Sequence, residues 1–570
     1  MKIVNILLFV LIFLLGIFIL NEDEQKQWSL SAFLPTDTQV YFEQSNGQEF
    51  VERFRHSRLG RVVRSLDYPQ ILKDAGLDQR ITLFLQVQRR TLEALADDRL
   101  VTTLLGRKYA LALLGPREWS VATSEPIRYL KQHLLLISRP LVRGRSFKGL
   151  LNDYLHNRSV TTTRYGRYEI QRIVLAGGDV LALAEVSGFV LCSLEERVVR
   201  ESLDLHDRKK PALNTQPAFL SFSQEMEGAE LFVYCAVAAL QRQAQALAQD
   251  GATILGDGGR ELVSLTGIRR VAYGGWRQPN LMKKRIIIGL NHETMDARLR
   301  QMMENTPTLN FSLPYVSRDV LLYYWSNSLE LKMLWDMYTS RFGADSREVV
   351  EMEKEITRLF GHDVDGLIQL LGSNIAIMVR ENKNENFVPI PDFAILLKLR
   401  DSQATGKAMR QALNKLDIKT KAGTYRKVKY FSWGIDPNES LQPVYAIHRD
   451  YLIFANTLNI LQIILDTPVN NTRLVASKGF KAIDPGFQTL NNSVCYIDQV
   501  RLLRRLQEFV GWAGLMLAIQ DREAAEKTKT LIDNLLDPLF DGLSMYEQSA
   551  TRTYLKGGRV YIESQIRYAK

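Results

Sequence analysis

The histidine and carboxylate residues of this chain are spread along the sequence rather than grouped in the patterns that metal chemistry needs. None of the seven histidines takes part in an HExxH or HxH spacing, which would place two imidazoles on one metal ion. The segment GHDVDG, residues 361–366, brings His362 close to Asp363 and Asp365, which are metal-ligand residue types. Short polar residues between two helices also cap helix ends, and we interpret this segment as caps. The sequence therefore predicts no metal site.

Two glycine-bearing segments share part of their pattern with nucleotide-binding loops. DSQATGKAM (Asp401–Met409) contains Gly-Lys, but it lacks both the leading glycine and the Ser or Thr that follows the lysine of a P-loop. GDGGRE (Gly256–Glu261) does not follow a predicted strand, as a dinucleotide site requires. No GxSxG nucleophile elbow is present. The sequence therefore predicts no cofactor and a protein that is not an enzyme.

The three cysteines give no indication of redox or metal chemistry. Cys192, Cys235 and Cys495 each lie in an apolar, strand-like run, which is typical of buried free thiols. Their odd number and wide spacing exclude a disulfide framework, and there is no CxxC pair. One bridge between two of them remains an alternative if the protein occupies an oxidising compartment.

The charge pattern leads to one hypothesis about surface contacts. The chain carries 73 basic and 63 acidic residues, a net charge of +10, which describes a mixed, solvated surface. No block of basic residues alternates with aromatic residues, so we expect no nucleic-acid partner. The stretch RFRHSRLGRVVR is either an exposed helix face or a contact for anionic lipid headgroups. The residues that would make this contact are Arg53, Arg55, Arg58 and Arg61.

A second surface hypothesis concerns the segment LLRRLQEFVGWAGLMLAIQ (Leu502–Gln520), which is apolar on most sides of a helix. Such a helix is either buried in a core, or it lines a groove for a lipid or for a partner helix. Charged residues in its first half exclude a membrane span. The residues that would line the groove are Leu506, Phe509, Trp512 and Leu515.

The first residues of the chain predict a membrane anchor. The segment Ile3–Leu20 is interrupted only by Asn5 and Gly16. As a helix it would extend about 27 Å, close to the ~30 Å hydrocarbon core of a bilayer. Lys2 precedes it and three acidic residues follow it, so the positive-inside rule places the N-terminus in the cytoplasm. No A-x-A-like cleavage site follows, and we predict an uncleaved signal-anchor over residues 1–24, with a cleaved signal peptide as the alternative.

The same strand-and-helix pattern occurs twice in the chain. VYFEQSN (Val40–Asn46) and LLYYWSN (Leu321–Asn327) are short aromatic, β-prone runs that end in Ser-Asn. A glutamate follows each asparagine three residues later, which is the spacing of a capping box. We therefore expect each strand to be followed by an amphipathic helix that begins at its asparagine.

The order of the later elements also repeats. Each copy continues with strands, a three-strand meander and a closing helix that ends at Asp204 or Asp466, and a shorter strand, helix and hairpin follow. We therefore predict a duplicated two-module unit after the N-terminal transmembrane helix. Because strands dominate and do not alternate regularly with helices, the predicted fold class is α+β with mostly antiparallel sheets. The predicted modules are A1 (32–205), B1 (212–291), A2 (309–467) and B2 (478–570).

The opening LPTDTQVYFE, followed by SRLGRVVRSLDYPQILKDAGL, resembles an uncharacterised (domain-of-unknown-function) family of N-terminally anchored bacterial envelope proteins. Members of that family begin with Leu-Pro-x-Asp-Thr and a short aromatic strand. The second copy keeps Leu313 and Pro314 but has no Asp-Thr. The resemblance implies no activity, and it implies a bacterial, inner-membrane-tethered setting. The matching residues are Leu34, Pro35, Asp37, Thr38 and Tyr41.

These features predict a membrane-anchored, extracytoplasmic protein with a non-enzymatic binding or scaffolding role in the bacterial cell envelope. It would cross the inner membrane once, with the bulk of the chain in the periplasm, and its partners would be other envelope proteins. The alternative is a carrier or chaperone for a lipid or a hydrophobic polypeptide held in a groove between modules. An enzyme is a third hypothesis, which a pocket with convergent carboxylates or a His–carboxylate pair would support.

Overall fold

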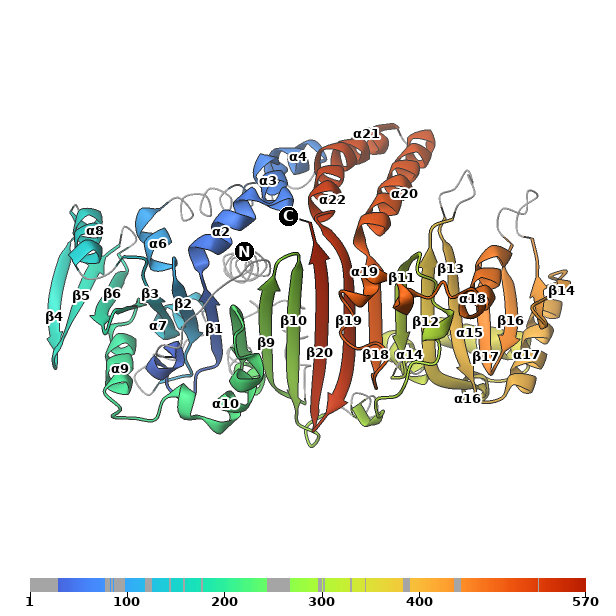
Figure 1. Cartoon of the computed structure of the whole chain (residues 1–570), viewed down its shortest axis with the longest axis horizontal. Helices are drawn as coiled ribbons and strands as arrows, with labels where there is room; N and C mark the ends of the chain where they lie inside the picture. Colours follow the sequence, from blue (N-terminus) through green and yellow to red (C-terminus); the bar gives the residue numbers. More distant parts are fainter. Residues whose placement is uncertain are drawn as a thin grey trace. The chain divides into compact units, whose positions relative to one another are not determined.

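The computed structural model of the chain describes residues 29–569, except for 77–97 (apart from 83 and 86), 118–125, 143–144, 157–158, 176–177, 243–266, 296–302 (apart from 300), 329–330, 344, 383–389, 435–441 and 521. The chain divides into two compact units (Figure 1). Unit 1 comprises Met1–Met295 and Gly558–Val560, and unit 2 comprises Asp296–Gly557 and Tyr561–Lys570.

Unit 1 is built on an antiparallel sheet with the strand order β4-β5-β6-β7-β3-β2-β1-β8-β9-β10. The strand that enters the sheet first, β1, therefore lies near its middle, between β2 and β8. The strands are β1 (Val40–Ser45), β2 (Lys108–Leu113), β3 (Leu134–Arg139), β4 (Val160–Tyr165), β5 (Tyr168–Val174), β6 (Val180–Val186), β7 (Phe189–Ser193), β8 (Leu231–Cys235), β9 (Ile268–Gln278) and β10 (Leu281–Leu290).

The helices of unit 1 connect these strands, and α9 packs on β3, β6 and β7. They are η1 (Leu30–Phe33), α2 (Gly47–His56), α3 (Arg58–Ser65), α4 (Tyr68–Asp74), α6 (Arg99–Leu104), α7 (Pro126–His133), α8 (Arg145–Leu155), α9 (Glu196–His206), η2 (Leu213–Thr215), α10 (Pro217–Ser223) and η3 (Gln224–Met226).

Unit 2 has a sheet with the order β14-β15-β16-β17-β13-β12-β11-β18-β19-β20, and its pairings from β14 to β19 are antiparallel. The strands are β11 (Val320–Ser326), β12 (Leu371–Arg380), β13 (Asp392–Leu399), β14 (Lys421–Tyr425), β15 (Val428–Ser432), β16 (Val444–His448), β17 (Tyr451–Ala455), β18 (Ser493–Asp498), β19 (Tyr546–Lys556) and β20 (Arg559–Tyr568).

The helices of unit 2 include the longest described helix of the chain, α20, which packs on β11, β18 and β19. The helices are η5 (Leu313–Tyr315), α14 (Leu331–Phe342), α15 (Arg347–Phe360), α16 (Val364–Leu370), α17 (Ser402–Lys415), α18 (Leu458–Asn470), η6 (Leu474–Ala476), α19 (Lys478–Lys481), α20 (Gln499–Gln520), α21 (Arg522–Leu531), η7 (Ile532–Leu536) and α22 (Asp537–Leu543).

The two units share one strand order, because each strand of unit 1 has its counterpart ten strands later in unit 2. In both units the first strand of module A pairs with a strand of module B. The strand β1 of A1 pairs with β8 of B1, and β11 of A2 pairs with β18 of B2. The segments A1 and B1 therefore contribute to one sheet, and so do A2 and B2.

A side-chain contact recurs at the same place in both units. In unit 1 the Tyr165 hydroxyl at the end of β4 donates to Asp204 Oδ2 of α9, over 3.0 Å. In unit 2 the Tyr425 hydroxyl at the end of β14 donates to Asp466 Oδ2 of α18, over 2.8 Å. Each contact ties the turn of the outer hairpin to the helix that closes the meander.

The cores lie on the central strands, where aromatic residues alternate with smaller ones. Tyr323 and Trp325 of β11 have no exposed surface, and Tyr41 of β1 is 1% exposed. The buried Tyr323 hydroxyl keeps a polar partner because it lies 2.8 Å from both Ser312 Oγ and Asn310 Nδ2. A buried hydroxyl without such partners would cost stability, so these contacts fix the segment that leads into β11.

The predicted transmembrane helix is not supported. It falls on residues 1–28, which lie outside the described residues. Within the part of the chain that the structure describes, no helix combines the length and apolar character needed to cross a bilayer. The longest, α20, carries Arg501, Arg504, Arg505 and Glu508. The fold class with an N-terminal transmembrane helix is therefore wrong for the structure as described. Three predictions that rested on this helix are withdrawn: the signal-anchor, the single-span membrane partner, and the inner-membrane and periplasmic location.

The predicted strand at 40–46 is found at 40–45, but the predicted capping box after it is wrong. Asn46 adopts a left-handed conformation (φ 54°), and its side chain makes no capping hydrogen bond to α2. Its counterpart Asn327 donates instead to the Thr306 carbonyl and to Thr308 Oγ1, both over 2.9 Å. The asparagine spacing is thus the same in both copies, but Asn46 does not cap α2 and Asn327 binds the segment at 306–308.

Leu396 of β13 provides a test of the unit 2 core, because it is 1% exposed. The substitution Leu396→Ala is expected to lower the free energy of unfolding by about 2–5 kcal/mol, through lost burial and the cavity left behind. The same substitution at Leu416, which is 49% exposed, is the matched control and should cost less than about 1 kcal/mol. Urea unfolding of both variants measures the difference, and equal losses would contradict this assignment of the core.

Candidate functional site

Charged side chains meet at one edge of the unit 2 sheet, where three neighbouring strands begin or end. Both β12 and β18 pair with β11 and run antiparallel to it, so the start of β11 lies beside the ends of β12 and β18. Asp319 immediately precedes β11, Arg380 ends β12 and Asp498 ends β18. The register of the sheet thus brings together residues far apart in the sequence.

Arg501, in the first turn of α20, connects this edge to the helix. Its Nε donates to Asp498 Oδ2 over 2.9 Å, and its backbone N–H donates to Asp498 Oδ1 over 3.2 Å. Its two terminal nitrogens donate to the carbonyls of Asp319 and Val320, over 3.1 and 3.2 Å. One turn later, Arg505 forms an ion pair with Glu381. We call these contacts the α20 anchor; they fix the start of α20 to the sheet.

The ion pair between Asp319 and Arg380 completes the edge. The Arg380 side chain is 8% exposed. Burial acts to raise the pKa of Asp319, but hydrogen bonds from Arg380 and Ser317 outweigh it and hold this pKa below its usual value. Asp319 is therefore charged at neutral pH and acts as a fixed counter-ion.

Asp392, at the start of β13, is the most deeply buried carboxylate near this edge. It has no exposed surface, and burial raises its pKa above the usual value. It accepts hydrogen bonds from Thr457 Oγ1 at 3.0 Å and from Asn459 Nδ2 at 3.3 Å. A raised carboxyl pKa is typical of general acids, but a carboxylate without exposed surface cannot touch a substrate. Its role here is to join β13 to the start of α18.

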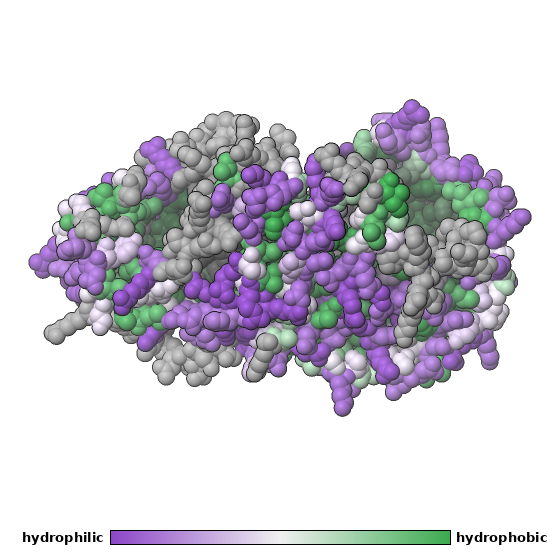
Figure 2. Space-filling model, turned by 90° about the horizontal axis from the view of Figure 1, so that it is seen from above, coloured by the Kyte–Doolittle hydropathy of each residue, from purple (hydrophilic) through white to green (hydrophobic). Residues whose placement is uncertain are grey.

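Beyond its anchor, α20 carries large apolar side chains on its surface. Leu506 is 41% exposed, Phe509 42%, Leu515 67% and Ile519 77%. Trp512 is half-buried, and its ring lies 5.8 Å from that of Phe509 between centroids. Figure 2 looks onto the side of the molecule that carries α20 and α21, and it shows apolar residues gathered there. We call Phe509, Trp512, Leu515 and Ile519 the apolar stripe.

The apolar stripe follows one side of the helix, because its residues are spaced three or four positions apart. Single exposed apolar residues are ordinary, whereas several of them adjoining on one element mark an interaction surface. Of the residues predicted to line a groove, Leu506, Phe509 and Leu515 are exposed and Trp512 is half-buried. The segment is therefore not a fully buried core helix.

The arginines predicted to contact an anionic surface lie on α2 and α3, and several of them have local partners. Arg53 forms an ion pair with Glu49 over 3.3 Å. Arg61 donates to the His56 carbonyl over 2.9 Å. Arg55 and Arg58 also make contacts. The first contact lies within α2 and the second joins α3 to the end of α2, and the membrane partner that motivated the prediction is withdrawn above.

The residues Leu34, Pro35, Asp37 and Thr38 have a structural explanation. The Leu34 carbonyl accepts from the Leu213 N–H over 2.7 Å, and Thr38 Oγ1 donates to the Pro35 carbonyl over 2.7 Å. Asp37 and Glu201 both form ion pairs with Arg117, whose side chain is 10% exposed. The segment therefore forms the turn that leads the chain into β1.

The other chemical candidates of the sequence also have structural roles. Asp363 caps α16 by accepting from the Gly366 N–H over 2.7 Å, which confirms the cap interpretation. Asp401 caps α17 in the same way, by accepting from the Ala404 N–H over 2.8 Å. Gly256–Glu261 lies outside the described residues. Among the residues that are described, no group of three His, Cys, Asp or Glu side chains is placed to hold a metal ion.

Cys192, Cys235 and Cys495 are all free; Cys192 is buried as predicted, whereas Cys235 and Cys495 are only partly buried. Burial raises the pKa of Cys192 and that of Cys235 to about 12. These thiols are therefore protonated at neutral pH and are poor nucleophiles.

Comparison with known proteins gives little guidance. No family model and no curated protein matches the chain. Among solved structures, crystal form III of a protein named TP0453 is similar at 10% identity, covering 49% of this chain and 86% of that chain with a TM-score of 0.26. Crystal form I of the same protein gives 8% identity, 49% and 84% coverage, and a TM-score of 0.25. These TM-scores are too low to establish a common fold.

The α20 anchor can be tested by Arg501→Met, which keeps the length of the side chain and removes its charge. The Asp498 carboxylate, 9% exposed, would lose its charged partner, so we expect a loss of about 2–4 kcal/mol in the free energy of unfolding. Arg504→Met, at an exposed position of the same helix, is the matched control and should stay within about 0.5 kcal/mol of the wild type. Hydrogen exchange over residues 499–508 should quicken in the first variant alone, and unchanged exchange there would refute the anchor.

Unit 1 contains a buried histidine that should make its stability depend on pH. His133 is 1% exposed, its ring stacks on Tyr129 with centroids 4.1 Å apart, and its Nδ1 lies 2.7 Å from the Tyr129 carbonyl oxygen. Burial is the main cause that lowers the pKa of His133 below its ordinary value. The unfolded chain therefore takes up a proton at a higher pH than the folded chain does.

Because this pKa is lowered on folding, the contribution of His133 is fully present above about pH 6.5 and is lost as the pH falls below that value. We expect His133→Gln to show a smaller loss of stability than the wild type between about pH 6.5 and 5. Burial also lowers the pKa of His206 and that of His448, so some pH dependence will remain. Urea unfolding at a series of pH values measures this, and an unchanged slope would contradict it.

Proposed function

We propose that this protein is a non-enzymatic binding protein, and that the apolar stripe of α20 is the surface on which a partner polypeptide docks. The observation that supports this proposal most directly is the exposure of Leu515 and Ile519, at 67% and 77%, on the same helix side as Phe509 and Trp512. Burying such side chains against a partner is favourable by roughly 1.5–3 kcal/mol for each fully buried residue.

The dimensions of the stripe suit one amphipathic helix of a partner. From Phe509 to Ile519 the helix rises about 15 Å, which is close to three turns. A partner helix with apolar residues at positions i, i+3 or i+4, i+7, and i+10 or i+11 matches that length. A lipid carrier would need a cavity around an acyl chain, and an exposed helix face does not provide one.

The α20 anchor supports this role because it restricts the movement of the presenting helix. The Arg501 and Arg505 contacts hold the first two turns, and α20 also packs along α21 and α22. A surface that is ordered before binding loses less conformational entropy when the partner arrives. The charged residues near the anchor hold strand ends and helix starts together, and they are not arranged around a reacting group.

A photo-crosslinking side chain at position 515 tests the proposal in cells. We expect a discrete crosslinked partner from position 515 and none from position 529, where Lys529 is exposed on the polar part of α21. Adding Phe509→Ser and Ile519→Glu should lower the yield of the crosslinked product by at least about tenfold, because the apolar contact is lost.

The same substitutions should leave folding intact. Phe509 and Ile519 are exposed, so the free energy of unfolding should change by less than about 1 kcal/mol. Identical crosslinks from positions 515 and 529, or crosslinks that persist in the double variant, would rule out the apolar stripe as the docking surface.

A further inference from the structure

Helix α17 of unit 2 carries a surface hollow of about 460 Å³, and the described residues that line it are polar side chains of that helix. The residues are spaced along one helix side at positions i, i+3, i+4, i+7 and i+8, while the opposite side of α17 is buried. The lining residues are Lys407, Arg410, Gln411, Asn414 and Lys415.

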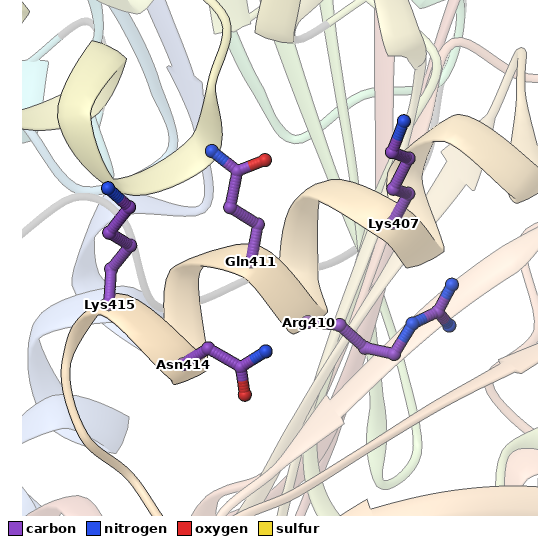
Figure 3. Close-up of a pocket in the computed structure, with 5 residues that line it drawn as sticks. All are labelled: Lys407, Arg410, Gln411, Asn414 and Lys415. Atoms are coloured by element: carbon purple, nitrogen blue, oxygen red, sulfur yellow. The ribbon is translucent and has the colours of Figure 1, made fainter.

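The lining side chains form two rows. Figure 3 shows Lys407, Gln411 and Lys415 extending to one side of the helix and Arg410 and Asn414 to the other. The space between the rows runs along the helix axis. All five groups carry N–H donors, and none of them is a carboxylate.

In the part of the chain that the structure describes, none of the three cations makes an ion pair and neither side-chain amide makes a hydrogen bond, although Arg410 lies close enough to Tyr445 to act on it electrostatically. Other arginines of unit 2, such as Arg426 and Arg552, have carboxylate partners. Lys407 and Arg410 lie three positions apart, and like charges at this spacing on a helix repel each other until an anion compensates them.

The preference for positive charge at the C-terminal end of a helix explains the position of one of these cations. It does not explain the positions of the other two. Lys415 lies in the last turn of α17, where the helix dipole favours positive charge. Lys407 and Arg410 lie in the body of the helix, where that preference does not apply.

A neighbouring glycine leaves room for one wall of the hollow. Gly361 ends α15 in a left-handed conformation (φ 71°), and a Cβ there would come within 2.5 Å of Gln411 Nε2. A larger residue at position 361 would displace the Gln411 amide from its present place.

We propose that this hollow is a binding site for a multivalent anion that carries two or more phosphate groups. Lys407 and Lys415 are eight residues apart, so about 12 Å of helix separates them, and one small anion cannot reach both. The Arg410 guanidinium can donate two parallel hydrogen bonds to one phosphate, while the lysines supply point charges. The site is separate from the apolar stripe and does not depend on the proposed polypeptide partner.

Isothermal titration of the full chain with inorganic tripolyphosphate tests the site, at about 50 mM salt, where screening of exposed charges is modest. We expect tripolyphosphate to bind at least about tenfold more tightly than orthophosphate, because only the longer anion reaches both ends of the hollow. The double variant Lys407→Gln/Arg410→Gln should weaken tripolyphosphate binding by about tenfold or more.

The matched control is Lys73→Gln/Arg99→Gln, which removes two exposed cations from α4 and α6 of unit 1 and changes the net charge equally. It should leave binding within about twofold of the wild type, and thermal unfolding should show that both double variants are folded. Absence of binding by the wild type, an equal loss in both variants, or equally tight binding of the tricarboxylate citrate would each overturn the proposal.

Discussion

One guanidinium group holds the long helix of unit 2 to its sheet. Arg501 reaches the Asp498 carboxylate and the carbonyls of residues 319 and 320, so a single side chain spans the end of β18 and the entry to β11. The planar donor fork of arginine suits this task, since its hydrogen bonds need little further ordering. Together with the Arg505–Glu381 pair, this contact fixes the first two turns from which the rest of α20 extends.

The same principle operates where the chain enters each sheet. In unit 1, Arg117 lies between Asp37 and Glu201, and in unit 2, Arg380 pairs with Asp319. Both arginine side chains are about nine-tenths buried, and a charge removed from water needs a close partner of opposite sign. These charged residues, which could have been taken for catalytic groups, thus have the structural role of joining the first strand of each sheet to its neighbours.

Local signals in the sequence predicted local structure well. The strand at 40–46, the cap at Asp363 and the free thiols follow from short patterns, since each depends on nearby backbone or on apolar surroundings. The capping box at Asn46 failed because its backbone conformation is left-handed, which residue spacing does not reveal.

Features that depend on contacts between residues far apart in the sequence could not be predicted from such short patterns. The joining of segments A1 and B1 in one sheet requires the pairing of β1 with β8, across nearly two hundred residues. The sequence left α20 open between core and surface, because its exposure depends on which elements cover it. The hollow on α17 was missed for a simpler reason: Lys407 was considered only as part of a P-loop. The helical spacing of Lys407, Arg410 and Lys415 was visible in the sequence and would have been the signal to follow.

The three native thiols, of which one is buried and two are partly buried, have a practical consequence for spectroscopy. With a pKa of about 12 for Cys192 and Cys235, and a raised pKa for Cys495, the native sulfur atoms carry almost no thiolate near neutral pH. A cysteine introduced at a solvent-facing position would therefore react with a maleimide dye faster than the buried Cys192 does. Cys192 can stay in place when a fluorophore is attached to either unit, and the partly buried Cys235 and Cys495 are the two to replace.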